Sequence, residues 1–294
     1  MRTTVLILGL AAGLASTTLP ADPAQAQRRA EHTPDLTFPY GGDGLQQIDF
    51  YRAETDIAGP APLVIFVHGG GWRRGDKDMD ARGHKAAFYP AQGYHYASIN
   101  YRLLPQAPVE EQARDVARAI RILFDRAEEL GIDRDRVVLS GHSAGAHLAA
   151  LVGTDPQYLA SVDLDHGDIA GIVPIDGAAY DVPRQMSGRK PLMGRIYRQA
   201  FGTEAARQRA LSPTLHAAQP NVAEFLILHV ERKDGIEQSE ALAAALERNG
   251  GNAELGRFPG KGLRGHAEIN RELGDPDYAA TALVDRWLED LFGR

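Results

Sequence analysis

The chain of 294 residues contains no cysteine, which excludes disulfide bonds and a lipid-anchored cysteine behind a signal sequence. It also lacks an excess of positive charge, since the formal net charge is −7 and the pI is about 5.8. A nucleic acid or an anionic membrane would favour a basic surface, so neither is expected as the main partner. The sequence shows no internal repeat, no low-complexity tract and no linker. We therefore expect one large domain.

Hydrophobic residues make up 44% of the chain, enough to bury a sizeable core. Apolar stretches typical of strands alternate with helical stretches, which favours a parallel sheet flanked by helices. A long amphipathic helix is expected over 109–130 and an early edge strand over 46–52. Arg102 and Asp115 are expected to form a structural ion pair near the end of the sheet.

The first residues have the pattern of a secretory signal peptide. A basic residue follows Met1, an apolar stretch covers 5–15, and Ala24-Gln25-Ala26 resembles a cleavage site. The apolar stretch is too short for a membrane span. We expect residues 1–26 to be removed after Ala26, with export to a periplasm or beyond. A flexible segment over 27–38 and a catalytic domain over 39–294 would then remain, without an integral membrane span.

The pentapeptide Gly141-His142-Ser143-Ala144-Gly145 lies between an apolar run and a helix-prone run. This context is typical of a nucleophile elbow, a sharp strand-to-helix turn that exposes a serine hydroxyl. Glycines suit such a turn because a Cβ would obstruct the close approaches that it requires. Ser143 is therefore the candidate nucleophile. The alternative is an ordinary surface loop that is rich in glycine and serine.

A second motif, His68-Gly69-Gly70-Gly71-Trp72, follows the apolar run Leu63–Val67. A buried strand that ends in three glycines can direct bare backbone amides at an oxyanion, and acyl transfer requires such donors. We expect the donors to be the amides of Gly70, Gly71 and Ala144. The alternative is a glycine-rich connection with a purely steric purpose.

A serine hydroxyl needs a general base, and His266 is the best-placed histidine because it comes late in the chain. It is expected in a flexible loop behind a strand over 253–258. The alternative is a surface histidine without a catalytic role.

The orienting acid is expected in the loop after the strand Phe225–Val230, before a helix over 236–249. Asp234 is the first choice and Glu231 the reserve. Asp176, at the end of an earlier strand, is the less favoured substitute. Alternatively, the acids of this loop only pair with its basic residues in solvent.

Together these motifs resemble the α/β-hydrolases of the esterase type, and in particular the HGGGW-bearing carboxylesterases and kynurenine-formamidase-like hydrolases. The resemblance covers the chain from about residue 39 onward and includes His68–Trp72, Ser98–Leu103, Gly141–Gly145, Ser212-Pro213 and His266. The elbow carries His142 where the hormone-sensitive-lipase-like branch has Asp, which favours the formamidase-like and feruloyl-esterase-like branch. The acid also departs from the family pattern, because Asp234 runs directly into Gly235 without a Val-Pro-like turn.

The resemblance implies an α/β-hydrolase fold with a mostly parallel central sheet of about eight strands flanked by helices. It also implies that a small insertion around 181–210 caps the site, although a solvated surface is the alternative for that stretch. The expected activity is hydrolysis of small-molecule carboxylic esters by a serine esterase, with no cofactor and no metal. An arylformamidase with the same triad and a non-catalytic binding protein are the alternatives. The oligomeric state does not follow from the sequence.

Overall fold

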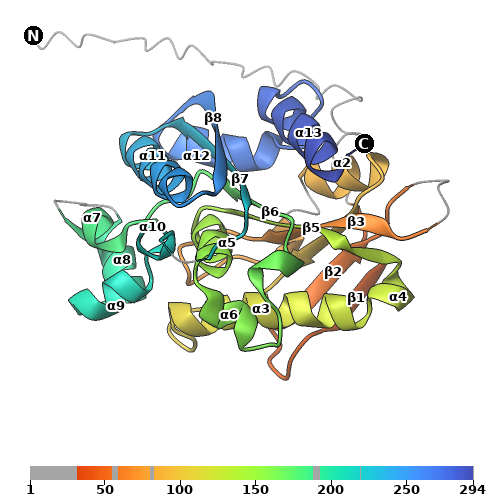
Figure 1. Cartoon of the computed structure of the whole chain (residues 1–294), viewed down its shortest axis with the longest axis horizontal. Helices are drawn as coiled ribbons and strands as arrows, with labels where there is room; N and C mark the ends of the chain where they lie inside the picture. The colour runs from red at the N-terminus through yellow and green to blue at the C-terminus, as the bar shows by residue number, and fades with distance from the viewer. Residues whose placement is uncertain (1–31, 55–58, 80–82, 188–192, 219, 294) are drawn as a thin grey trace, which may run out of the picture. The chain divides into compact units, whose positions relative to one another are not determined.

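The computed structural model describes residues 32–54, 59–79, 83–187, 193–218 and 220–293. The expected signal peptide and most of the expected flexible segment over 27–38 lie outside these residues. Helices surround a central sheet in the described part of the chain (Figure 1).

The sheet has eight strands in the order β1-β2-β4-β3-β5-β6-β7-β8. The first two neighbouring pairs are antiparallel and all the others are parallel, which confirms the expected mostly parallel sheet. The strands are β1 (Leu36–Pro39), β2 (Gln47–Tyr51), β3 (Ala61–Val67), β4 (His95–Ile99), β5 (Ile132–His142), β6 (Gly171–Ile175), β7 (Glu224–Glu231) and β8 (Asn252–Lys261). Because parallel strands end at the same edge, loops distant in sequence meet there.

Each face of the sheet buries its own apolar core, because successive side chains of a strand point to opposite faces. In β3, Leu63 and Ile65 belong to one core, whereas Val64 and Phe66 belong to the other. The first core is covered by α3 (Val109–Asp125), α5 (Ala144–Thr154) and α11 (Lys233–Arg248). The second is covered by α2 (Lys85–Ala91), α12 (Gly262–Glu272) and α13 (Ala279–Phe292).

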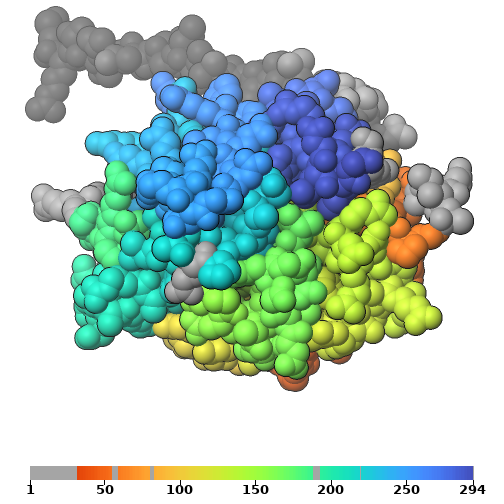
Figure 2. Space-filling model, in the orientation of Figure 1, coloured from red at the N-terminus to blue at the C-terminus, as the bar shows by residue number. Residues whose placement is uncertain are grey.

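Shorter helices connect these layers. They are η1 (Lys77–Met79), α4 (Ala127–Leu130), α6 (Pro156–Ala160), η2 (His166–Asp168) and α10 (Pro213–His216). Within the expected cap insertion the structure has α7 (Val182–Met186), α8 (Gly194–Phe201) and α9 (Ala205–Ala210). Figure 2 shows these three helices, in green to teal, as the surface at the left of the face drawn there.

Three local expectations need correction. The strand β2 is not at the edge, because β1 pairs with it on its outer side, and β1 begins at Leu36 inside the segment expected to be flexible. The helix expected over 109–130 is divided at Arg126, whose φ of −102° and ψ of 12° leave the helical region. Arg126 therefore separates α3 from the short helix α4.

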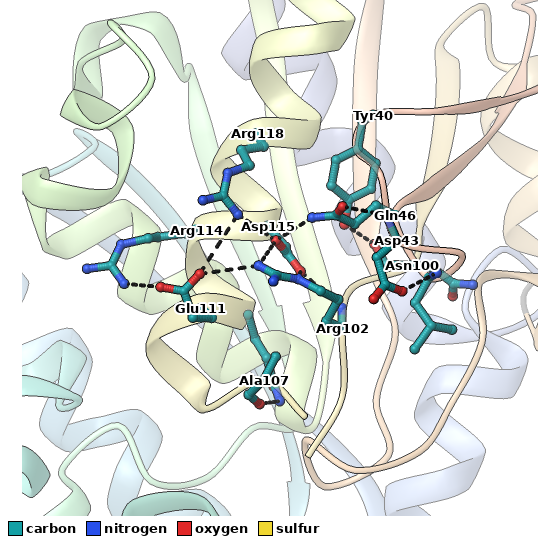
Figure 3. Close-up of polar contacts among 12 residues, drawn as sticks. Tyr40, Asp43, Gln46, Asn100, Arg102, Ala107, Glu111, Arg114, Asp115 and Arg118 are labelled. Atoms are coloured by element: carbon teal, nitrogen blue, oxygen red, sulfur yellow. Dashed lines mark hydrogen bonds and ion pairs between the residues drawn. The ribbon is translucent and has the colours of Figure 1, made fainter. Parts of the chain in front are cut away.

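The expected ion pair between Arg102 and Asp115 is confirmed, and it lies within a larger polar network (Figure 3). Arg102 donates from Nε and Nη2 to the two oxygens of the buried Asp115 carboxylate, over 2.8 and 2.7 Å. Gln46 and Arg118 donate to the same carboxylate. The network ties the segment after β4 to helix α3.

This anchored segment supports the glycine-rich loop, residues 68–72, at the end of β3. The carbonyl of Trp72 accepts hydrogen bonds from the Leu104 amide and from Nε2 of Gln112, both over 2.8 Å. The Tyr101 hydroxyl donates to the carbonyl of His68 over 3.0 Å, and the two rings stack. The glycine-rich loop is thus held at both ends by the segment after β4 and by α3.

Candidate active site

Ser143 occupies the sharp turn between β5 and α5. Its φ of 58° and ψ of −113° are unusual for a non-glycine residue, as expected of a nucleophile elbow. A Cβ on Gly145 would lie 2.0 Å from the Val67 carbonyl oxygen, and one on Gly141 would lie 2.5 Å from the Gly145 carbonyl oxygen. The two glycines therefore permit close backbone packing, while the unusual backbone conformation belongs to the serine.

The structure brings His266 to Ser143. The serine hydroxyl lies 3.0 Å from Nε2 of His266 and can donate to it. His266 is not in a loop, as the sequence suggested, but in the first half of helix α12, which follows β8 directly.

The acid that contacts His266 is Asp176, which follows β6. Its Oδ2 lies 2.5 Å from Nδ1 of His266, and its side chain is fully buried. Because a carboxylate only accepts, this contact places the imidazole proton on Nδ1 and leaves Nε2 as the acceptor for Ser143. The backbone amide of Val230 donates to Oδ1 of the same carboxylate.

The expectation for Asp234 is wrong, because α11 begins at Lys233 and places Asp234 in its first turn. There its carboxylate accepts from Arg232 over 3.1 Å and from Gln185 of α7 over 3.2 Å, rather than from His266. The reserve, Glu231, is exposed and lies 3.5 Å from Arg257. The sequence had indicated Asp176, at the end of a strand, only as the less favoured substitute for this acid.

Charge and hydrogen bonding keep Asp176 ionised. Burial raises the pKa of this carboxyl, but the hydrogen bond from His266 and the charge of Arg232 outweigh burial and lower it below its usual value. The Arg232 guanidinium lies 3.4 Å from Oδ2 and donates to the carbonyls of Asp176 and Gly177. Arg232 therefore helps to keep Asp176 ionised and also holds the backbone of the loop that carries it.

His142, which the sequence marked only as a departure from the lipase-like branch, supports His266 from behind. Its Nε2 donates to the backbone carbonyl of His266 over 2.9 Å, and the two ring centroids are 4.4 Å apart. Burial lowers the pKa of His142 well below its usual value, so this ring is neutral. The elbow thus contacts both the imidazole of His266, through Ser143, and its backbone carbonyl, through His142.

The glycine-rich loop lies beside Ser143. Gly70 and Gly71 have φ of 126° and 64°, and a Cβ on Gly70 would lie 1.8 Å from the carbonyl oxygen of Arg74. Within the described residues, the amides of Gly70 and Gly71 donate to no backbone carbonyl. The amide of Ala144, at the first position of α5, has no acceptor within its own helix.

A cavity of about 960 Å³ opens over these groups. Its described lining includes Ser143, His266, the glycine-rich loop and three residues in and before α8, namely Met193, Ile196 and Tyr197. The insertion therefore contributes apolar and aromatic side chains to the cavity. Its residues 188–192, which include Arg189 and Lys190, lie outside the described residues.

No part of the described cavity lining resembles a metal centre. Elsewhere, in the described residues, the ligand atoms of His84, Glu272 and Asp275 lie within 4.8 Å of one another. Nε2 of the histidine lies 3.6 and 3.7 Å from the two carboxylates, which is too far for a hydrogen bond. Among the described helices, none combines the length and the apolar character that crossing a membrane requires.

Comparison with known families gives one match that covers most of the fold. The profile of the BD-FAE family matches residues 48–246, which include the glycine-rich loop, the elbow and Asp176. His266 lies C-terminal to the matched range.

Individual relatives are similar in sequence to parts of the chain. Esterase LipC of Mycobacterium tuberculosis is 36% identical over 126 residues, covering 42% of this chain and 31% of that protein. Kynurenine formamidase of Drosophila melanogaster is 31% identical over 118 residues, covering 40% of this chain and 38% of that protein. These matches span well under two thirds of the relatives' lengths.

Solved structures show the fold over nearly the whole chain. The crystal structure of esterase B from Lactobacillus rhamnosis superimposes with a TM-score of 0.71 at 22% identity, covering 92% of this chain and 91% of that one. The chain therefore has the α/β-hydrolase fold that the motifs predicted.

Proposed function

The chain belongs to the BD-FAE family, and from this premise and the geometry of the site we propose that it is a serine esterase that hydrolyses carboxylic esters. The observation that carries the proposal is the continuous hydrogen-bonded chain from Ser143 through His266 to Asp176 at the floor of a cavity. The relationship to an esterase, LipC, supports it.

In the proposed mechanism, Ser143 attacks the ester carbonyl while Nε2 of His266 takes the hydroxyl proton. The imidazolium is stabilised by the ionised Asp176. The carbonyl oxygen becomes an oxyanion that accepts from the amides of Gly70, Gly71 and Ala144. His266 then returns the proton to the leaving alkoxide, which departs as the alcohol and leaves an acyl-serine.

Water completes the cycle. His266 removes a proton from a water molecule, whose oxygen attacks the acyl carbon, and the serine oxygen leaves and takes that proton back. The products are one carboxylic acid and one alcohol, with the enzyme unchanged. No step requires a metal or an organic cofactor.

We propose small to medium acyl or aromatic esters as substrates, because Ile196, Tyr197 and Met193 supply apolar walls to the cavity. An arylformamidase is the second candidate, and the relationship to kynurenine formamidase is the observation that favours it. The N-terminal signal pattern favours an esterase over an arylformamidase, because the proposed export after Ala26 would remove the protein from cytoplasmic tryptophan breakdown.

A fluorophosphonate probe tests the nucleophile. Intact-mass spectrometry should show one adduct on the wild-type protein and on a control variant, Ser161→Ala, whose serine lies outside the cavity lining. The Ser143→Ala variant should show none. A wild-type protein that stays unmodified would support the alternative hypothesis of a non-catalytic binding protein.

The substrate class is tested on one panel. We expect p-nitrophenyl esters of short and medium acyl length to be hydrolysed faster than N-formylkynurenine, with feruloyl esters included as aromatic acyl substrates. Faster turnover of N-formylkynurenine would replace the esterase proposal with the formamidase.

A further inference from the structure

The described lining of the cavity has an excess of positive charge, opposite in sign to the net charge of the chain. The chain as a whole carries a net charge of −7. The described cavity lining, in contrast, contains four arginines and a single carboxylate, that of Asp176. The arginines are Arg73, Arg74, Arg232 and Arg271.

Two of these arginines are engaged within the protein. The side chain of Arg232 is mostly buried, pairs with Asp176 and Asp234, and stabilises the loop that carries Asp176. Arg271 donates from Nε to Glu272 over 2.6 Å. The charge of each of these two arginines is therefore partly neutralised by an acidic partner within the protein.

Arg73 and Arg74 differ, because no carboxylate among the described residues lies within ion-pair distance of either guanidinium. Both residues are exposed at the mouth of the cavity. In a protein with more acidic than basic residues, two adjacent arginines without an acidic partner in the described part of the chain leave a local excess of positive charge at the site.

The backbone fixes these arginines next to the reacting centre. They directly follow the glycine-rich loop, and the Arg73 amide donates to the Gly70 carbonyl over 3.5 Å. The carbonyl oxygen and Cγ of Arg74 lie 1.8 and 3.2 Å from the point that a Cβ on Gly70 would occupy. The stem of Arg74 therefore starts beside the amide proposed to bind the oxyanion, and Arg73 and Arg74 line the same cavity as Ser143.

We propose that this esterase selects esters that carry a carboxylate close to the scissile bond, with Arg73 and Arg74 binding that carboxylate. A planar guanidinium pairs with a carboxylate through two parallel hydrogen bonds, which suits recognition at a fixed distance from the oxyanion amides. The inference rests on the proposed esterase function. It concerns the charge of the substrate, which the triad by itself leaves open.

The test compares each anionic ester with a neutral amide of the same shape. Monoethyl succinate and ethyl succinamate place the group on the acyl side, whereas 4-acetoxybenzoate and 4-acetoxybenzamide place it on the alcohol side. The readout is the ratio of kcat/KM for the acid to kcat/KM for the amide, measured by pH-stat for the wild type and for Arg73→Gln, Arg74→Gln and the double variant. Differences in folding or general activity cancel in this ratio.

We expect the wild type to prefer the acid in at least one arm by about fivefold to tenfold, the effect of one or two exposed ion pairs. The arm that shows the preference identifies the side of the ester that carries the carboxylate. The double variant should have an acid-to-amide ratio close to that of the uncatalysed reactions. Salt at about 0.5 M should lower the wild-type ratio, because salt screens exposed charges. Arg286→Gln, an exposed arginine outside the cavity lining, should keep the wild-type ratio.

A wild-type preference for the amides in both arms, or a preference for the acid that survives in the double variant, would overturn the inference and leave the esterase proposal intact. Failure to hydrolyse any ester of the panel would instead reject the proposed function itself.

Discussion

Nδ1 of His266 lies 2.5 Å from Oδ2 of Asp176, a fully buried carboxylate that follows β6. The carboxylate after β7, Asp234, is separated from the imidazole by Arg232, which pairs with both acids. An arginine thus stands between the acid that orients the base and the acid that the chain order suggested. This arrangement makes the two aspartates separable by experiment.

Replacing Asp176 with Asn should lower kcat at least about a hundredfold, with KM little changed. The amide keeps the shape but favours the wrong imidazole tautomer, and loss of this carboxylate in serine proteases costs about ten-thousandfold. The measurement is steady-state kinetics on a p-nitrophenyl ester, with circular dichroism to verify folding.

Asp234→Asn is the matched control for that variant and should cost far less, because its carboxylate contacts Arg232 and Gln185 rather than the base. If Asp234→Asn proved the inactive variant while Asp176→Asn kept most of its turnover, the orienting acid would have to be reassigned.

Gly70→Ala should lower kcat by about a hundredfold to a thousandfold, the typical effect of losing one oxyanion donor. The new methyl would collide with the Arg74 carbonyl oxygen and displace the amides of the glycine-rich loop. Gly44→Ala provides the comparison, because no heavy atom other than those of its chain neighbours lies within 4 Å of the point that the new methyl would occupy. The activity of this variant should stay at the wild-type level. Equal kinetics for the two variants would contradict the role of the glycine-rich loop.

The buried His147 should make folding stability depend on pH. Burial lowers its pKa to about 4, whereas in the unfolded chain it titrates near 6.5. Its contribution is therefore complete above about pH 6.5 and is lost as the pH falls toward 4, because the unfolded state binds the proton first.

Between pH 7 and pH 5 this residue should account for a loss of about 2 kcal/mol of unfolding free energy. Urea denaturation of the wild type and of His147→Gln, whose side-chain amide can still donate to the Leu211 carbonyl, measures the difference. The variant should lose less stability over that interval, and parallel pH profiles of the two proteins would refute the assignment.

The proposed export predicts a mature chain that begins at Gln27, because Ala24-Gln25-Ala26 has the small residues that signal peptidase requires. Edman sequencing of periplasmic protein reads the first residue directly. Replacing Ala26 with a bulky residue such as Phe should block cleavage. Periplasmic material that still begins with Met1 in the wild type would show an uncleaved anchor instead.

The fold and most of the residues at the site could be predicted from the amino-acid sequence alone. The glycine-rich motif and the elbow pentapeptide combine local strand, turn and helix signals with backbone conformations that few residues allow, so Ser143 and the glycines could be placed from short-range patterns. The resemblance of motifs in the correct chain order then predicted the mostly parallel sheet.

Which acid orients His266 follows from the packing of distant elements, because that contact joins residues 90 positions apart. The sequence places an aspartate after β6 and another after β7, and nothing local distinguishes them. The start of α11 at Lys233 and the position of Arg232 turn Asp234 toward α7, while the end of β6 directs Asp176 at the imidazole. Such long-range geometry depends on how whole elements pack, and no periodicity or motif in a single sequence encodes it.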